Sequence, residues 1–208
     1  MNHEVSTVDH VYWLGGSPCS GKSSIADHLA ATHGLDVYRC DDAFYRHQSL
    51  ISPTEQPVWS RLASATCDDL WMRPVAQQVD EELAVYREQF PFILADLIAR
   101  PRSRPVIAEG AALLPELIDG LAGPRRAIWM VPEPDFQVTH YARREWRHDV
   151  LQTCTDPEQA WRNWMDRDIG FARHVAGNAR ERGFEVLVVD GSRPLDEMIR
   201  VVETYFGL

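Results

Sequence analysis

An eight-residue stretch near the start of the chain has the residue types needed to bind phosphate groups. Residues 16–23 read Gly-Ser-Pro-Cys-Ser-Gly-Lys-Ser and match the pattern G-x-x-x-x-G-K-[ST] at every fixed position. The two glycines let the backbone turn tightly and present N–H groups to phosphate oxygens. Lys22 would place its charge on the β- and γ-phosphates, and Ser23 would offer its hydroxyl to Mg²⁺. The predicted nucleotide contacts are Gly16, Ser17, Pro18, Cys19, Ser20, Gly21, Lys22, Ser23 and Ser24.

Two adjacent carboxylates, Asp41 and Asp42, follow the next apolar segment of the chain. One of them could accept the proton of an attacking hydroxyl, while the other holds a Mg²⁺-bound water or orients the first. The alternative is that both residues cap the following helix. With the glycine-rich loop upstream we favour catalysis. Asp42 is the preferred base, and Asp41 is a second candidate and a candidate metal contact.

Five short apolar segments, separated by helical stretches, are expected to position these residues. Strands alternating with helices predict an α/β fold with a five-stranded parallel sheet covered by helices on both faces. Ligands in such sheets bind beyond the carboxyl ends of the strands, where the candidate residues fall. The predicted strands are 11–14, 35–40, 105–108, 127–131 and 185–189. The predicted helices are 22–33, 67–100 with interruptions at Pro74 and Pro91, 113–121, 135–149, 157–182 and 194–206.

The bulk composition limits the other possibilities. The chain has 208 residues and a formal net charge of −10, which predicts one domain over residues 1–208 that does not coat nucleic acid. We expect no signal peptide and no membrane helix, and therefore a cytoplasmic protein. The four cysteines lie far apart without a CxxC pair, which predicts free thiols rather than a zinc site. Oligomeric state is left open.

The loop at 16–23, followed by Asp-Ala-Phe-Tyr-Arg at 42–46, resembles the P-loop nucleoside and small-molecule kinases. Uridine kinases and nicotinamide-riboside kinases have a similar Asp-x-Phe/Tyr-Tyr segment. Chloramphenicol phosphotransferases, zeta toxins, gluconate kinases and shikimate kinases place a catalytic aspartate similarly. The resemblance covers residues 10–46 and the later strand ends, and it is specific for the superfamily but not for one member. It implies an ATP- and Mg²⁺-dependent phosphotransferase acting on a hydroxyl of a nucleoside, a sugar or an antibiotic-like molecule.

The resemblance also implies roles for residues later in the chain. In these kinases an Asp or Glu that ends the third strand helps to hold Mg²⁺, and Glu109 is the candidate here. Asp190 has a similar position after the last strand, although a loop cap explains it better. The turn that follows, with Ser192 and Arg193, corresponds to the segment that runs beside the adenine base in similar kinases.

Arginines suited to phosphate oxygens occur in residues 134–175, where the resembled kinases have a lid. Arg143 and Arg147 lie four apart, so that in the predicted helix they would share a face. We predict these two as catalytic and Arg144 as a nucleotide contact. The alternative is a solvated helix face paired with nearby carboxylates. Arg162, Arg167 and Arg173 are weaker candidates, and the run Asp-Arg-Asp at 166–168 could be internally paired.

The stretch from 47 to 104 would build the acceptor pocket in the resembled kinases. Its aromatic residues, beside a few arginines, suit an acceptor that carries a ring, although such residues are more often part of a core. These residues are Trp59, Trp71, Tyr86, Phe90 and Phe92, with Arg46, Arg61 and Arg73. Two other functions stay open: a kinase of nucleotide sugars similar to zeta toxins, and a nucleotide-binding regulatory module without transfer. ATP or GTP preference is not decided by the sequence.

Overall fold

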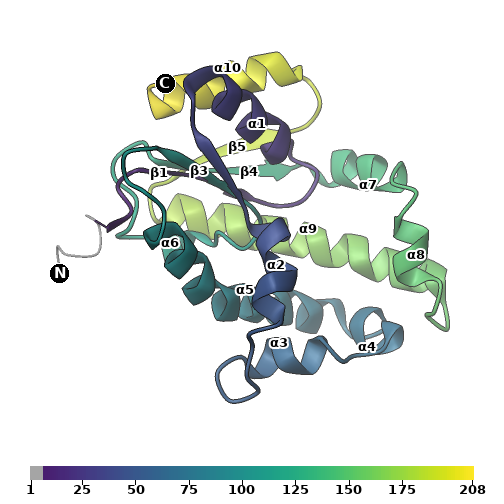
Figure 1. Cartoon of the computed structure of the whole chain (residues 1–208). Helices are drawn as coiled ribbons and strands as arrows, with labels where there is room; N and C mark the ends of the chain where they lie inside the picture. Colours follow the sequence, from purple (N-terminus) through teal and green to yellow (C-terminus); the bar gives the residue numbers. More distant parts are fainter. Residues whose placement is uncertain (1–6) are drawn as a thin grey trace.

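The computed structural model describes residues 7–208 (Figure 1). Within this range five strands form one sheet in the order β2-β3-β1-β4-β5, and every neighbouring pair is parallel. The predicted fold class is therefore confirmed. The strands are β1 Val11–Gly16, β2 Asp36–Arg39, β3 Val106–Glu109, β4 Ala127–Pro132 and β5 Glu185–Val189.

Helices cover both faces of the sheet, as Figure 1 shows. α1 (Lys22–His33) and α10 (Leu195–Phe206) pack on one face, and α5 (Val75–Ile98), α6 (Pro115–Ile118) and α9 (Pro157–Glu181) pack on the other. The alternation of side chains along β1 explains the two layers. Trp13 belongs to the α5–α9 core, whereas Leu14 belongs to the α1–α10 core. All six residues of β1 are buried, as expected for a central parallel strand.

The remaining helices stand at the carboxyl ends of the strands and beside α5. Figure 1 shows α2 in front of α9 and below the strands, α3 and α4 further below, and α7 and α8 at one side. Their bounds are α2 Cys40–Gln48, α3 Pro57–Leu62, α4 Cys67–Trp71, α7 Pro134–Ala142 and α8 Arg147–Leu151.

Two predicted helices differ from the observed ones. The interruption expected at Pro91 is wrong, because α5 runs through it. Pro91 is exposed, and its neighbours Phe90 and Ile93 are buried in the core, so packing holds both halves of the helix in place.

The single helix predicted for 135–149 is also wrong, since α7 ends at Ala142 and α8 begins at Arg147. The turn between them brings the Trp146 ring within 6.1 Å of Tyr141 and 5.9 Å of Trp164. Because the break depends on this tertiary packing, the helical periodicity of the sequence does not predict it. Arg143 and Arg147 consequently do not share a helix face.

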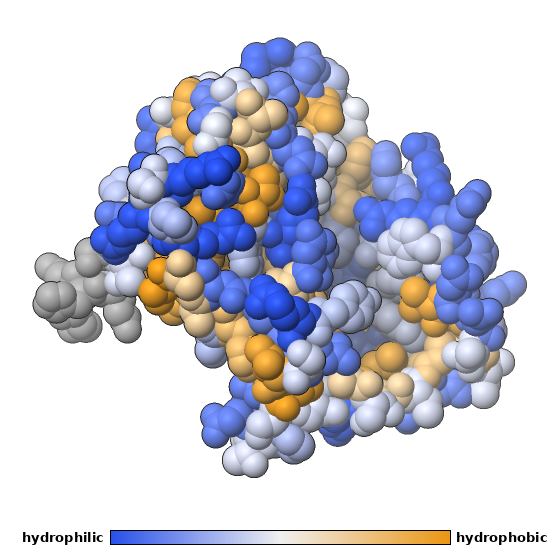
Figure 2. Space-filling view, in the orientation of Figure 1, coloured by the Kyte–Doolittle hydropathy of each residue, from blue (hydrophilic) through white to orange (hydrophobic). Residues whose placement is uncertain are grey.

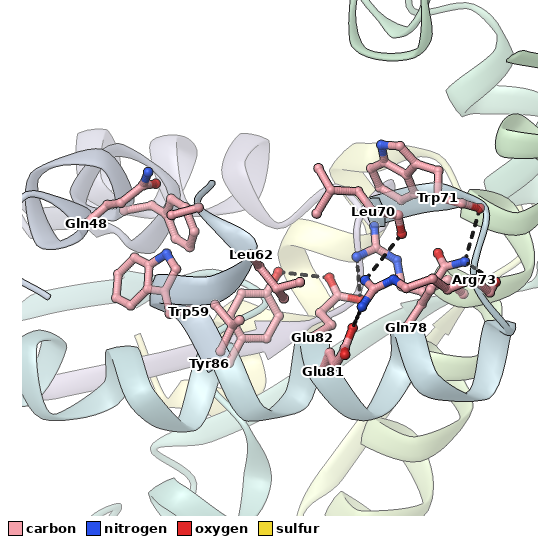
Figure 3. Close-up of a pocket in the computed structure, with 14 residues that line it drawn as sticks. Gln48, Trp59, Leu62, Leu70, Trp71, Arg73, Gln78, Glu81, Glu82 and Tyr86 are labelled. Atoms are coloured by element: carbon pink, nitrogen blue, oxygen red, sulfur yellow. Dashed lines mark hydrogen bonds and ion pairs between the residues drawn. The ribbon is translucent and has the colours of Figure 1, made fainter. Parts of the chain in front are cut away.

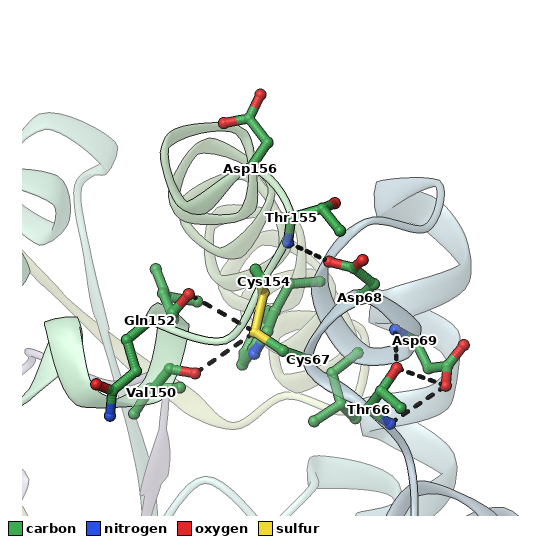
Figure 4. Close-up of a disulfide and its surroundings, with 12 residues drawn as sticks. Thr66, Cys67, Asp68, Asp69, Val150, Gln152, Cys154, Thr155 and Asp156 are labelled. Atoms are coloured by element: carbon green, nitrogen blue, oxygen red, sulfur yellow. Dashed lines mark hydrogen bonds between the residues drawn. A yellow bond between two sulfur atoms is a disulfide. The ribbon is translucent and has the colours of Figure 1, made fainter.

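The expectation of four free thiols is wrong for two of the cysteines. Cys67, at the start of α4, forms a disulfide with Cys154, in the segment before α9 (Figure 4). Their Cα atoms are 5.0 Å apart, although 87 positions separate them in the sequence. Such a long-range pairing cannot be read from cysteine spacing. In the described part of the chain, Cys19 and Cys40 are free, and no helix is long and apolar enough to cross a bilayer.

Candidate functional site

The loop of residues 16–23 connects β1 to α1 and is packed tightly against β4. Gly16 has φ 129°, and a Cβ atom there would lie 1.9 Å from the carbonyl oxygen of Met130. The Ser17 N–H donates to the same carbonyl oxygen at 3.1 Å. Gly21, with φ 85°, is the N-cap of α1. The loop therefore curls around a helix N-terminus, whose unpaired N–H groups and dipole favour a bound anion.

Lys22 reaches back over this loop. Its Nζ donates to the Ser17 carbonyl oxygen at 2.7 Å and lies 3.3 Å from the Ser20 hydroxyl oxygen. Burial lowers the pKa of Lys22, while the negative charges of Glu109 and Asp41 raise it. The ammonium group is thus buried beside two carboxylates, where its attraction for phosphate is screened little by water.

Ser23 and Glu109 form a pair of oxygen ligands beside the loop. The Ser23 hydroxyl donates to Glu109 Oε1 at 3.1 Å. Glu109 ends β3, in register with Leu14 of β1 and Arg39 of β2. Burial raises the pKa of Glu109, and the charge of Lys22 opposes this shift.

This pair fits the needs of Mg²⁺. Among residues 7–208 there is no group of three or more His, Cys, Asp or Glu side chains arranged to hold a metal. Mg²⁺ usually keeps several waters and takes one or two protein oxygens together with phosphate oxygens. A hydroxyl and a carboxylate next to a phosphate-binding loop match that donor set. The predicted metal contacts Ser23 and Glu109 are therefore side by side.

The structure separates the two adjacent aspartates. Asp41, in the first turn of α2, lines the cavity at the loop together with Lys22 and Glu109. Both aspartates are exposed. Asp42 is not among the residues that line the cavity, because one residue further along a helix means a rotation of about 100°. The lining of the cavity favours Asp41 as the base, and the choice between the two aspartates stays a prediction.

The start of α2 is fixed by close packing on β3. Cys40 is buried, and a Cβ atom on Gly110 would lie 2.5 Å from the Cys40 Cβ. The Gln89 amide Nε2 lies 3.4 Å from the Cys40 carbonyl oxygen. A substitution at Gly110 would thus displace the helix that carries Asp41.

The far end of α2 is held by Asp96 of α5. Its carboxylate accepts hydrogen bonds from Tyr38 at 2.8 Å and Arg46 at 2.7 Å, and lies 2.9 Å from His47 Nε2. Burial alone would raise the pKa of Asp96, but these hydrogen bonds outweigh it and hold the pKa at about 2. Arg46, predicted to border the acceptor, has this bracing contact instead.

The cavity at the loop has a volume of about 480 Å³. Figure 2 shows the surface hollowed between the α2 side and the α8 side of the molecule. Besides residues 18–24 of the loop and α1, the cavity is lined by Asp41, Glu82, Tyr86, Glu109, Gly110, Ala111, Tyr141, Arg144, Trp146, Trp164 and Arg167.

The wall opposite the loop is a buried ionic cluster on α5 and α9. Arg167 Nη1 lies 2.9 Å from Glu82 Oε2, and Arg167 Nε lies 2.7 Å from Asp168 Oδ1. The Tyr86 hydroxyl donates to Glu82 Oε1 at 3.1 Å. Burial raises the pKa of both Glu82 and Asp168, and Arg167 opposes both shifts.

Sequence reasoning ranked this cluster too low. The internal pairing considered for residues 166–168 is observed between Arg167 and Asp168, and Arg167 also lines the cavity. Glu82 was missed altogether. A carboxylate on the buried side of α5 was the available signal, because such a group requires a partner.

The three predicted lid arginines have different surroundings. Arg144 lines the cavity, with its guanidinium 4.7 Å from the centre of the Tyr141 ring. Arg143 is exposed at the end of α7. Arg147 lies over the Trp161 ring at 4.7 Å and lines a separate surface hollow beside α8. Arg144, predicted as a nucleotide contact, is thus the one that the structure brings to the loop.

The turn after β5 is held by its own side chains. The Asp190 carboxylate accepts hydrogen bonds from the Ser192 N–H at 2.9 Å and the Ser192 hydroxyl at 2.6 Å. Arg193 Nε lies 3.8 Å from Glu197. Asp190 thus has the capping contacts expected of a loop aspartate, and contact of Ser192 and Arg193 with adenine stays a prediction.

Gln137 of α7 is a contact that the sequence gave no reason to expect. It is fully buried, and its Nε2 lies 3.2 Å from Ser17 Oγ and 3.3 Å from the Pro18 carbonyl oxygen. It connects the helix before Arg144 directly to the glycine-rich loop.

A second pocket, of about 360 Å³, adjoins the first and is drawn in Figure 3. It lies between α2, α3, α4 and α5, in the stretch predicted to hold the acceptor. Trp59, Trp71, Tyr86 and Arg73 line it, whereas Phe90 belongs to the core, the role expected more often for such aromatic residues. The two cavities share three lining residues, which are Glu82, Tyr86 and Arg167.

Comparison with known proteins adds little beyond this geometry. No protein-family model matches the chain, and no curated protein matches it. An uncharacterized protein from Eubacterium ventriosum is similar in structure, with a TM-score of 0.49, 14% identity and coverage of 95% of this chain and 97% of that one. A gluconokinase from Sinorhizobium meliloti has a TM-score of 0.43 and 16% identity, with coverage of 97% and 93%. Similarity at this level carries no information on activity, so a functional assignment has to rest on the site itself.

Proposed function

We propose that the chain transfers the γ-phosphoryl group of ATP to a hydroxyl group of a small molecule. The proposal rests on the observation that two neighbouring cavities share part of their lining. One cavity is bordered by the glycine-rich loop with Lys22, and the other by aromatic residues of the 47–104 stretch. The shared wall, with Glu82, Tyr86 and Arg167, is where a group could pass from one ligand to the other. An enzyme that only hydrolysed a nucleotide would have no need of the second pocket.

The loop and Lys22 account for binding of the phosphates. Backbone N–H groups of the loop and the N-terminus of α1 would donate to phosphate oxygens. Lys22 would exchange its hydrogen bonds to Ser17 and Ser20 for the oxygens of the β- and γ-phosphates. Mg²⁺, held by the Ser23 hydroxyl and through water by Glu109, would supply charge neutralisation at these oxygens.

We assign the role of general base to Asp41, because it lines the cavity at the loop. In the transfer, the acceptor oxygen bonds to the γ-phosphorus while the bond from that phosphorus to the bridging oxygen breaks, and ADP leaves. The proton of the acceptor hydroxyl passes to the Asp41 carboxylate. Arg144 and Arg167, which line the same cavity, would face the oxygens of the transferred group and stabilise the charge on them.

Nucleotide binding can be tested apart from transfer, because Lys22 is the only lysine in the sequence. An acyl-phosphate derivative of ATP acylates an amine near its phosphates and releases ATP. We expect the label at Lys22, competed by ATP with Mg²⁺. The Lys22→Arg variant should not be labelled within the chain. Labelling restricted to the terminal amine of the wild type would contradict the assignment of the loop.

Transfer itself requires an acceptor screen. Release of ADP is measured across a panel of alcohols, nucleosides, sugars and antibiotics, and we expect stimulation by a subset of related compounds. Lys22→Ala should abolish the stimulated rate while circular dichroism stays unchanged. ATP binding without stimulation by any compound would favour a regulatory module and contradict the proposal.

A further inference from the structure

Four aromatic side chains contribute to the walls of the second pocket. Phe44, Trp59, Trp71 and Tyr86 line it, and Figure 3 shows Trp59 and Tyr86 toward one end and Trp71 at the other. The Phe44 and Trp59 rings are 4.7 Å apart, which gives that end a continuous aromatic surface. The volume of the whole pocket, about 360 Å³, suits a ligand with one or two rings.

The charged residues of this pocket neutralise one another. Its lining holds two arginines and two glutamates. Glu81 forms ion pairs with Arg73 and, at 2.7 Å, with Arg61 from outside the lining. Glu82 pairs with Arg167 at 2.9 Å. With all four groups ionised, the lining therefore carries no formal net charge, and each of these side chains already has an ion-pair partner.

A charged ligand would be disfavoured here for a physical reason. It would lose hydration on entry, and the pocket could compensate only by breaking an ion pair that is itself shielded from water. An uncharged ring meets no such penalty and gains contact with the aromatic walls.

Besides Arg73 Nε, two polar atoms of neutral side chains that line the pocket have no hydrogen-bond partner within the described residues. Trp59 is 2% exposed and Gln78 is 4% exposed, and both line it. Trp59 Nε1 and Gln78 Oε1 have no hydrogen-bond partner within the described residues, whereas Gln78 Nε2 donates to the carbonyl oxygens of Trp71 and Arg73. Buried polar atoms are nearly always satisfied, so one free donor and one free acceptor favour a ligand with neutral polar groups.

We infer that the acceptor is an uncharged alcohol built on an aromatic or apolar ring. Its ring lies among the aromatic residues, and its hydroxyl points to the shared wall at Glu82, Tyr86 and Arg167. The inference rests on the proposed function, because it takes this pocket as the acceptor site. It excludes sugar acids, nucleotide sugars and polycationic antibiotics as acceptors.

Three compounds with the same ring and chain length test the inference. 3-Phenylpropane-1,2-diol is neutral, 3-phenyllactate is an anion, and phenylalaninol is a cation at pH 7. Calorimetric titration without ATP gives the affinity of each, and quenching of tryptophan fluorescence reports contact with the pocket. We expect the diol to bind at least about tenfold more tightly than either charged compound. Equal or tighter binding of a charged compound, or failure of all three to bind at millimolar concentration, would overturn the inference.

Glu81→Gln provides a second test with a matched control. The substitution removes the partner of Arg61 and Arg73, and the pocket gains a positive charge. We expect the ratio of phenyllactate to diol affinity to rise by about tenfold. Asp80→Asn makes the same charge change at the preceding residue of α5, which is exposed, and should leave the ratio of affinities unchanged. An equal effect of the two variants, or no effect of Glu81→Gln, would count against the inference.

The two proposals fail in distinguishable ways. Charge-selective binding of the diol without any acceptor-dependent ADP release would leave the selectivity of the pocket intact and contradict phosphoryl transfer. ADP release stimulated only by charged acceptors would support transfer and contradict the uncharged acceptor.

Discussion

Reduction of the disulfide between Cys67 and Cys154 should destabilise the fold by a measurable amount. The bond closes a loop of 87 positions, and in the chain-entropy description it lowers the entropy of the unfolded state by about 15 cal/mol/K. At 25 °C this corresponds to about 4.6 kcal/mol, at the upper end of the roughly 2–5 kcal/mol found for native disulfides. For a chain of this length, a loss of that size lowers Tm by roughly 9–18 °C.

The assay is urea denaturation followed by tryptophan fluorescence, with and without dithiothreitol. The double variant Cys67→Ser/Cys154→Ser is the control, because it should match the reduced protein and show no further response to reductant. Thiol titration of the unfolded, unreduced wild type should detect two thiols, from Cys19 and Cys40. Four titratable thiols, or equal stability with and without reductant, would refute the reasoning.

Three further substitutions test the positions of single residues. Gly16→Ala should lower the free energy of unfolding by at least about 2 kcal/mol in urea denaturation, because the new Cβ would meet the Met130 carbonyl oxygen at φ 129°; wild-type stability would contradict this. Asp96 has a pKa of about 2 in the folded chain against an ordinary 3.8, so its contribution is complete above pH 3.8 and lost as the pH falls through 2. Asp96→Asn should therefore lower Tm at pH 6 and lower it much less at pH 2, and a constant difference in Tm would contradict this. Arg144→Met should lower kcat by about 10²-fold, while the exposed Arg143→Met should change it by less than about threefold in the same ADP-release assay; equal effects would contradict the placement of Arg144.

The features that the sequence predicted well are those encoded by adjacent residues. The glycine-rich loop is one continuous segment, and buried parallel strands such as 185–189 are continuous apolar runs. Glu109 and Asp190 both follow such a run, and the ends of parallel strands meet at one edge of the sheet. The resemblance to P-loop kinases was needed to prefer Glu109.

The features that it missed depend on rotation about a helix or on distant contacts. The choice between Asp41 and Asp42 depends on where α2 begins, and this is set by packing of Cys40 on Gly110. Glu82 reaches the site only because α5 lies against α9. Neither fact is visible in local sequence patterns.

The central claim is that phosphoryl transfer occurs at the wall shared by the two cavities, with Asp41 as the base. The most direct measurement is the transfer of label from γ-³²P-ATP to the acceptor that stimulates ADP release, using the wild type and both aspartate variants. We predict that Asp41→Asn lowers the rate of labelling by about 10²–10⁴-fold, while Asp42→Asn retains it within about threefold. Near-full labelling by Asp41→Asn, or label that appears only as inorganic phosphate in the wild type, would contradict the account.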